Sequence, residues 1–186
     1  MTLLDAINYV LPKLGEHQVT STDARSPTLR ILLHLFEQYR RTVLRKGWWI
    51  NEWTYEAPIN IDSEIDVGSD CLSLYAINRT DTAWKGTRLF NTATQGYKFD
   101  SPVKLRVIKD VAWDELPEPV QEWIKFAVLM DQLTTDAGLT PEYQVWAEGR
   151  VEAERQTLAE HLRNKRYNTK NSYRGRRMLA AIRGTM

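Results

Sequence analysis

The chain has 186 residues, 42% of them hydrophobic, and its 25 Lys and Arg side chains nearly balance 24 Asp and Glu. This length suits one large domain or two small ones, and no apolar run approaches the roughly 20 residues of a membrane-spanning helix. A single cysteine, Cys71, excludes an intramolecular disulfide and a cysteine-rich zinc site. The first residues lack the basic region and apolar core of a signal peptide, so we expect the protein to be assembled in the cytoplasm.

Two helices are predicted within residues 1–47. Thr2 and Asp5 form a capping-box pattern at the start of the first, and Pro12 should kink or shorten it. Ser26 and Pro27 provide an N-cap and a first-turn proline for the second. Its broad apolar face indicates a buried helix and comprises Leu29, Leu32, Leu33, Phe36, Tyr39, Val43 and Leu44.

At Gly47 the apolar pattern changes from helical spacing to alternation. Gly47 suits the left-handed residue that ends a helix, and the odd positions that follow predict an aromatic strand interrupted by Asn51. These apolar positions are Trp49, Trp53, Tyr55, Ala57, Ile59 and Ile61. Five tryptophans are predicted to lie in the core or at a subunit interface, two compatible alternatives; they are Trp48, Trp49, Trp53, Trp113 and Trp123.

Residues 48–112 are predicted to form a small antiparallel β domain, a sandwich or barrel of about five strands. Strands are expected at 71–77 and 103–107, and a hairpin at 88–99 with its turn ending in Gly96. Asp62, Glu64 and Asp66 alternate in an acidic loop, but no correctly placed glycine and glutamate complete a calcium-binding pattern. A solvent-exposed loop is therefore expected.

Helical patterns return in residues 113–163. The first helix has a buried face of Val120, Trp123, Ile124, Ala127 and Val128, extending to Leu133. Thr140 and Pro141 begin a second, more exposed helix. Its thin apolar stripe comprises Ala147, Val151, Leu158 and Leu162. The predicted fold is thus α+β: a helical body of about four helices (1–47 and 113–163), an inserted β domain (48–112) and an extended basic C-terminal tail (164–186).

The charge is unevenly distributed. From Arg163 onward there are eight basic side chains and no acidic one, whereas residues 1–162 hold all 24 acids and a net charge of −7. This segment is a solvated tail, a phosphate-binding segment with Tyr167 and Tyr173 stacking on bases, or a segment that folds onto an acidic protein partner or neighbouring subunit. The third alternative also explains the short apolar patch near the end of the chain, formed by Met178, Leu179 and Ile182. The residues concerned are Arg163, Arg166, Tyr167, Lys170, Tyr173, Arg174, Arg176, Arg177, Met178, Leu179 and Ile182.

Nothing in the sequence indicates catalysis. His17, His34 and His161 are scattered, with no His-Glu-x-x-His pair, phosphate-binding glycine loop or nucleophile elbow. The acidic pair Asp114 and Glu115 has a sufficient role at a helix start. We therefore expect no enzyme activity, metal or cofactor.

The order of these elements resembles the tail tubular protein A family, the head-to-tail adaptors or gatekeeper proteins of short-tailed bacteriophages. The resemblance covers most of residues 3–160, although each motif is short and structural. The stretches that carry it are Ile7 to Gly15 with Glu16, Arg45-Lys46-Gly47-Trp48-Trp49-Ile50-Asn51, Leu89-Phe90-Asn91 with Tyr97 to Phe99, and Trp113 to Ile124.

The resemblance implies a structural protein of the phage tail, assembled in the host cytoplasm. It implies a ring of twelve subunits between the portal protein and the distal tail or nozzle protein, with double-stranded DNA crossing the lumen unbound. In such a ring, the acidic residues Asp62, Glu64 and Asp66 are expected to face the DNA, and the basic tail to bind the portal. The alternative function is a nucleic-acid-binding protein that uses the tail.

Overall fold

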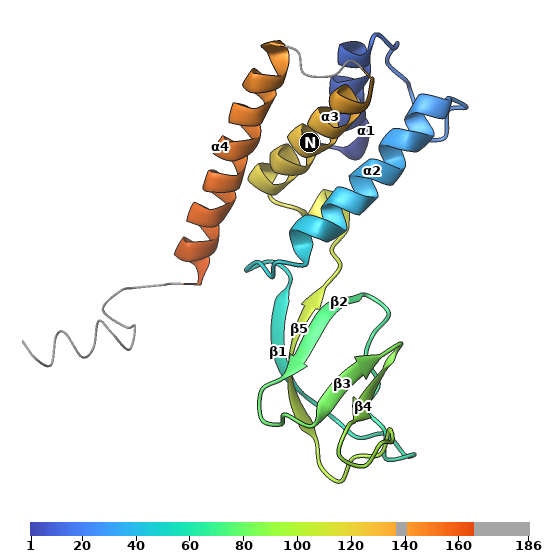
Figure 1. The fold of residues 1–186 in the computed structure, drawn as a ribbon, viewed down its shortest axis with the longest axis vertical. Helices are drawn as coiled ribbons and strands as arrows, with labels where there is room; N and C mark the ends of the chain where they lie inside the picture. The colour runs from blue at the N-terminus through green and yellow to red at the C-terminus, as the bar shows by residue number, and fades with distance from the viewer. Residues whose placement is uncertain (137–140, 166–186) are drawn as a thin grey trace, which may run out of the picture.

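The computed structural model describes residues 1–136 and 141–165, and it has the predicted α+β fold (Figure 1). The helices gather at one end of the elongated molecule and the strands at the other. The chain leaves the helices after α2 and returns to them after β5. The β module is therefore attached to the helices by two adjacent connections.

In the part of the chain that the structure describes, four α-helices form the helical end. Their bounds are α1, Leu3–Val10; α2, Pro27–Leu44; α3, Glu118–Asp136; and α4, Pro141–Asn164. Helix α3 lies between α2 and α4 (Figure 1) and is buried on most sides. Besides its apolar residues, it buries Gln121, Lys125 and Gln132. This central position explains why its apolar stripe is wide.

The first two helices begin as the sequence predicts. The Thr2 hydroxyl accepts a hydrogen bond from the Asp5 amide, and the Asp5 carboxylate accepts one from the Thr2 amide. Pro12 lies in a 3₁₀ turn, Leu11–Leu14, that continues from α1 and ends at Gly15 with φ of 76°. The Ser26 hydroxyl caps α2 by accepting from the Leu29 amide. Local capping and proline geometry thus determine these boundaries.

The junction after α2 differs from the predicted continuous strand. Gly47 has φ of 77°, as a helix-ending glycine should. Residues 49–51 then form a turn, and strand β1 begins only at Glu52 and ends at Ala57. The reason is Asn51, which is fully buried and accepts a hydrogen bond from the Trp48 amide at 2.8 Å. This closes a tight turn where alternation alone predicted a strand.

The β module contains five strands in two antiparallel sheets: β1, β2 (Cys71–Ala76) and β5 (Val103–Lys109) in the order β1-β5-β2, and β3 (Thr82–Lys85) paired with β4 (Arg88–Asn91). The predicted hairpin at 88–99 is wrong. Strand β4 instead pairs with the preceding strand β3, and Gly86, with φ of 62°, lies in the turn between them. Residues 97–99 form no strand, and Gly96 makes only an isolated bridge to Asn91.

Helix α4 is largely exposed, as predicted, but its apolar stripe is not the face that packs on α3. Val151, Leu158 and Leu162 are exposed, and Ala147 is only partly buried. The face packed on α3 instead includes Ala153 and Thr157, both buried, and Gly149. A Cβ atom at Gly149 would meet Phe126 ring carbons at 3.0–3.2 Å, so the small residue allows close packing of α3 and α4. Small side chains, rather than large ones, mark the buried face of this helix.

Candidate assembly surfaces

A buried asparagine links the helical body to the β module. Besides accepting from Trp48, Asn51 donates to the carbonyl oxygens of Leu44, at 3.0 Å, and Lys109, at 2.9 Å. One side chain therefore joins the end of α2, the turn before β1 and the end of β5. The Asn51 side chain thus makes three hydrogen bonds at a buried position, where an unpaired polar group would destabilise the fold.

A second set of contacts at the junction is ionic. Glu52, the first residue of β1, binds Arg106 of β5 and, at 2.9 Å, Lys165 just after α4. Although burial raises the pKa of Glu52, its hydrogen bonds to Arg106 and Lys165 outweigh burial and lower that pKa from its ordinary value. The end of α4, from which the basic tail continues, is thereby tied to the β module.

The predicted tryptophans lie in three environments. Trp48, Trp113 and Trp123 are buried, and the rings of Trp48 and Trp123 meet edge to face with centroids 5.7 Å apart. Trp49 is partly buried. Trp53 leaves 53% of its surface exposed, so it is not a core residue. Trp53 lies on β1, an edge strand of its sheet.

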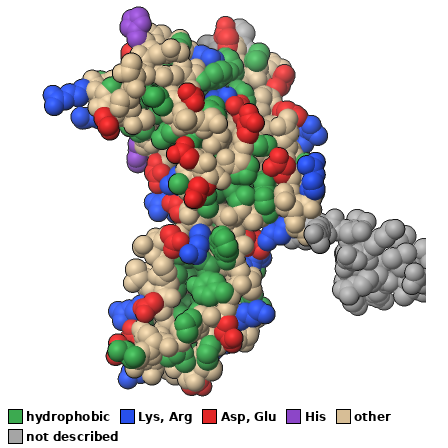
Figure 2. All heavy atoms as spheres, turned by 180° about the vertical axis from the view of Figure 1, so that it is seen from behind, with side chains coloured by type: hydrophobic (Ala, Val, Ile, Leu, Met, Phe, Trp, Pro, Cys, Tyr) green, Lys and Arg blue, Asp and Glu red, His purple; other side chains and the backbone are tan. Residues whose placement is uncertain are grey.

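The β module exposes further aromatic and aliphatic side chains. Figure 2 shows hydrophobic side chains gathered on one face of the module below the helical body. Single exposed apolar side chains are common on protein surfaces, whereas several that gather on one face are typical of contact surfaces. The exposed large apolar residues of the module are Trp53, Tyr55, Ile61, Tyr75, Ile77 and Trp84.

The three acidic residues of the loop differ in exposure and in their partners. Asp62 and Asp66 are exposed, whereas Glu64 is partly buried and pairs with Arg88 at 2.8 Å. Asp66 accepts a hydrogen bond from the Asn60 amide group at 2.9 Å. The loop is held against β4 by the hydrogen bond from the Leu89 amide to the Ile65 carbonyl. Of the three acids, only Asp62 and Asp66 present exposed carboxylates.

The histidines do not form a reactive group. His161 packs against the Trp48 ring, with centroids 5.4 Å apart, and burial followed by nearby Lys165 lowers its pKa. His17 and His34 are exposed at other places. Within residues 1–136 and 141–165, no three His, Cys, Asp or Glu side chains are grouped to hold a metal ion.

Most of the predicted portal-binding residues lie outside the described residues. Arg163, in the last turn of α4, is exposed. The ten others, from Arg166 to Ile182, fall within 166–186. The structure thus describes where the basic segment starts, beside the junction of the two parts of the molecule.

Comparison with known proteins identifies the family. The family model described as tail tubular protein matches residues 4–167. The chain belongs to the tail tubular protein family. It is 30% identical over 182 residues to tail tubular protein A of Klebsiella phage KP34, covering 97% of this chain and 98% of that protein. As a tail tubular protein, it is a structural component of a phage tail.

Sequence reasoning missed the residues that join the two parts of this tail tubular protein: Asn51, Glu52, Arg106 and Lys165. Asn51 was visible as the one polar residue that interrupts an apolar alternation. Glu52 and Lys165 are 113 positions apart, so their contact had no local signal. No helix among the described parts of the chain is long and apolar enough to cross a membrane.

Proposed function

We propose that this tail tubular protein is an adaptor whose copies form a ring between the portal protein and the distal nozzle of the tail, with the genome leaving through the lumen. The observation that carries the proposal is membership of the family over residues 4–167. We also propose twelve copies per ring and assembly in the host cytoplasm, as the resemblance to the tail tubular protein A family implies.

The division of the molecule supports separate contacts for the basic segment and for the β module. The basic segment starts at the end of α4, and we assign portal binding to Arg163 and to the charged, tyrosine and apolar residues of 166–186. The β module lies at the far end of the molecule (Figure 1). Its exposed Trp53, Tyr55 and Trp84 suit a contact with the distal tail protein.

We assign the acidic loop to the lumen. Exposed carboxylates at Asp62 and Asp66 would repel DNA phosphates, and Glu64 contributes less because Arg88 offsets its charge. Double-stranded DNA would then slide past without being bound. In an assembled ring, finding Asp62 and Asp66 on the outer rim would contradict this assignment.

A truncation tests the portal contact. A chain ending at Arg163 loses the basic segment after that residue and, with Lys165, one partner of Glu52. It should remain folded but bind purified portal much more weakly than the full chain. A chain with the Lys165→Ala substitution controls for loss of the Glu52 contact. Undiminished portal binding by the truncated chain would refute the role of the segment.

The second candidate function is nucleic-acid binding by the same segment. The absence of acidic residues after Arg163 and the interleaved Tyr167 and Tyr173 favour it. Phosphate binding should weaken steeply with added salt. A salt titration of the full chain with duplex DNA separates the functions, since the adaptor should show little affinity for DNA at physiological salt.

A further inference from the structure

Helix α4 has an apolar face that the described residues, 1–136 and 141–165, leave uncovered. We call Ala147, Val151, Leu158 and Leu162 the outer stripe. At 100° per residue these four positions fall within about 60° of one another, on the side of the helix away from Ala153 and Thr157. Val151, Leu158 and Leu162 are 58%, 48% and 45% exposed.

The flanks of the stripe favour a protein occupant with positive charge. Glu148 and Glu152 lie beside its first half, and Arg155 pairs with Glu152 at 2.6 Å. Among residues 1–136 and 141–165, Glu148 has no basic partner within salt-bridge distance. A shallow apolar groove lined by Gln144, Ala147, Glu148, Val151 and Glu152 runs along this half.

A surface of suitable chemistry lies on the opposite flank of the helical body. In Figure 1, α2 and α4 form the two sides of the body, with α3 between them. We call the exposed residues Ile31, His34, Gln38, Arg41 and Arg45 the outer face of α2. The arginine side chains can cover apolar surface with their stems while their charged ends reach carboxylates. Near this face, Arg40 and Arg41 pair with Glu37 and Asp110. Among the described residues, the exposed Arg30 and Arg45 have no acidic partner within salt-bridge distance.

The positions of the two surfaces determine which assembly they can form. Two different surfaces on opposite flanks make a head-to-tail contact, which repeats from copy to copy and closes into a ring when the rotation allows. A self-complementary contact of the stripe would instead stop at a dimer. Only the first arrangement is compatible with a tail adaptor ring.

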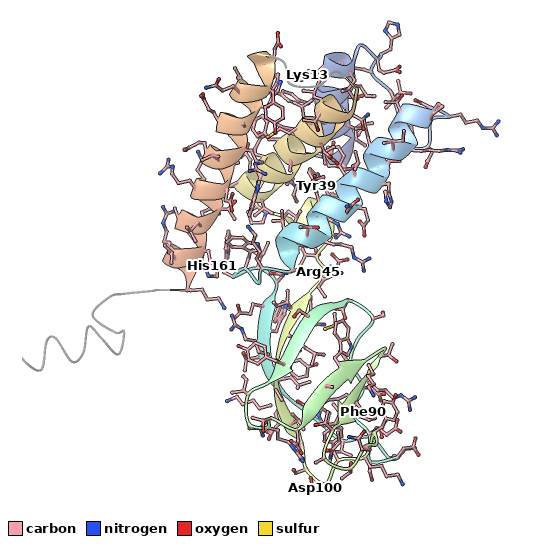
Figure 3. All side chains as sticks on the ribbon, viewed as in Figure 1. Lys13, Tyr39, Arg45, Phe90, Asp100 and His161 are labelled. Atoms are coloured by element: carbon pink, nitrogen blue, oxygen red, sulfur yellow. The ribbon has the colours of Figure 1, made fainter. Side chains whose placement is uncertain are left out.

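We infer that the outer stripe of α4 packs against the outer face of α2 in a neighbouring copy of this chain. This inference rests on the proposed function and specifies which residues hold the ring together. Figure 3 shows Arg45 and His161 at the same level, near the junction. In a ring whose axis follows the long axis of the molecule, the last turns of α2 and α4 in adjacent copies therefore lie at similar heights.

Charged substitutions on the two surfaces test the inference. Leu158→Glu removes an apolar contact of the stripe, and Arg45→Glu reverses a charge on α2; each should weaken ring assembly about tenfold or more. Val145→Glu is the matched control, since Val145 is 60% exposed on α4 but lies outside the stripe. Because all three positions are exposed, circular dichroism and melting should match the unmodified chain. Assembly is measured as the mass of the full chain, alone and on purified portal.

Mixing the Leu158→Glu and Arg45→Glu variants gives a second, independent test of the contact. The Leu158→Glu chain keeps an intact α2 face, and the Arg45→Glu chain keeps an intact stripe. Their mixture should yield one-to-one pairs that do not extend, because one good contact remains between the two. Rings formed by the Leu158→Glu variant, or a stripe contact that gives only dimers of the unmodified chain, would overturn the inference.

Cross-linking locates the contact directly. A chain carrying Leu158→Cys and Gln38→Cys, treated with a short bifunctional thiol reagent after assembly, should give a ladder of multimers, since native Cys71 is buried. Replacing Leu158→Cys by Val145→Cys should abolish the ladder. Equal ladders from both pairs would contradict the contact, while an unmodified chain that forms no ring even on portal would instead contradict the proposed function.

Discussion

At the scale of single residues, Asn51 shows how a polar side chain can decide the layout of a fold. It bonds three backbone groups, the farthest of which lies 58 positions from it in the sequence. The sequence predicts a break in the alternation at this position but not its partners, because the Lys109 carbonyl is brought close only by the pairing of β1 with β5. Tertiary contacts of this kind have no local signature.

We expect Asn51→Ala to destabilise the chain by about 2–5 kcal/mol, because three buried backbone groups lose their partner. Chemical denaturation of the full chain measures this difference. Asn164→Ala, which removes an exposed contact with the Glu160 carbonyl, serves as the control and should change stability by less than about 0.5 kcal/mol. Equal effects of the two substitutions would contradict the role of Asn51.

Glu52 should make stability depend on pH. Its contacts with Arg106 and Lys165 lower its pKa below the ordinary value of 4.5, so their contribution is present above that pH and lost as the pH falls through the folded-state pKa. Glu52→Gln should therefore cost about 1–3 kcal/mol at pH 7. In denaturation from pH 7 to pH 2, the gap between the two proteins should close in acid. A constant gap would show that the carboxylate charge contributes nothing.

At the scale of elements, capping and periodicity predicted most of the helices. Thr2, Ser26 and Gly47 act as their sequence context predicts. The errors lay in the β module, where Asn51 and Gly86 form turns that alternation did not predict. In α4 the stripe was predicted but its surroundings were not: Gly149 and Ala153 bring the helix close to α3 and leave Leu158 outside. Periodicity identifies an apolar face but not whether the same chain covers it.

Enlarging Gly149 should separate α4 from α3. In Gly149→Leu, the new side chain meets the Phe126 ring, and we expect a loss of about 1–3 kcal/mol despite the higher helix propensity of leucine. The melting temperature of the full chain reports this loss. Ala159→Leu, at an exposed position of the same helix, should be close to neutral. A stabilised Gly149→Leu variant would show that the close packing is not needed.

At the scale of the whole molecule, the α+β fold and the position of the β strands between α2 and α3 followed from the sequence. The assembly surfaces were less predictable than the fold, because they consist of residues without a sequence motif that only the folded chain places side by side. Loss of the outer stripe or of the α2 face should impair the same contact between neighbouring copies, whereas loss of the basic segment should impair the contact with the portal. These effects should be separable, since the surfaces lie at different places on the chain.

We propose that the protein acts by forming a ring within the tail. The most direct measurement is an electron cryomicroscopy reconstruction of the phage particle that contains this chain. We predict a closed ring of its copies directly below the portal, with the β modules pointing away from the head. A reconstruction with no such ring at that level would contradict the account.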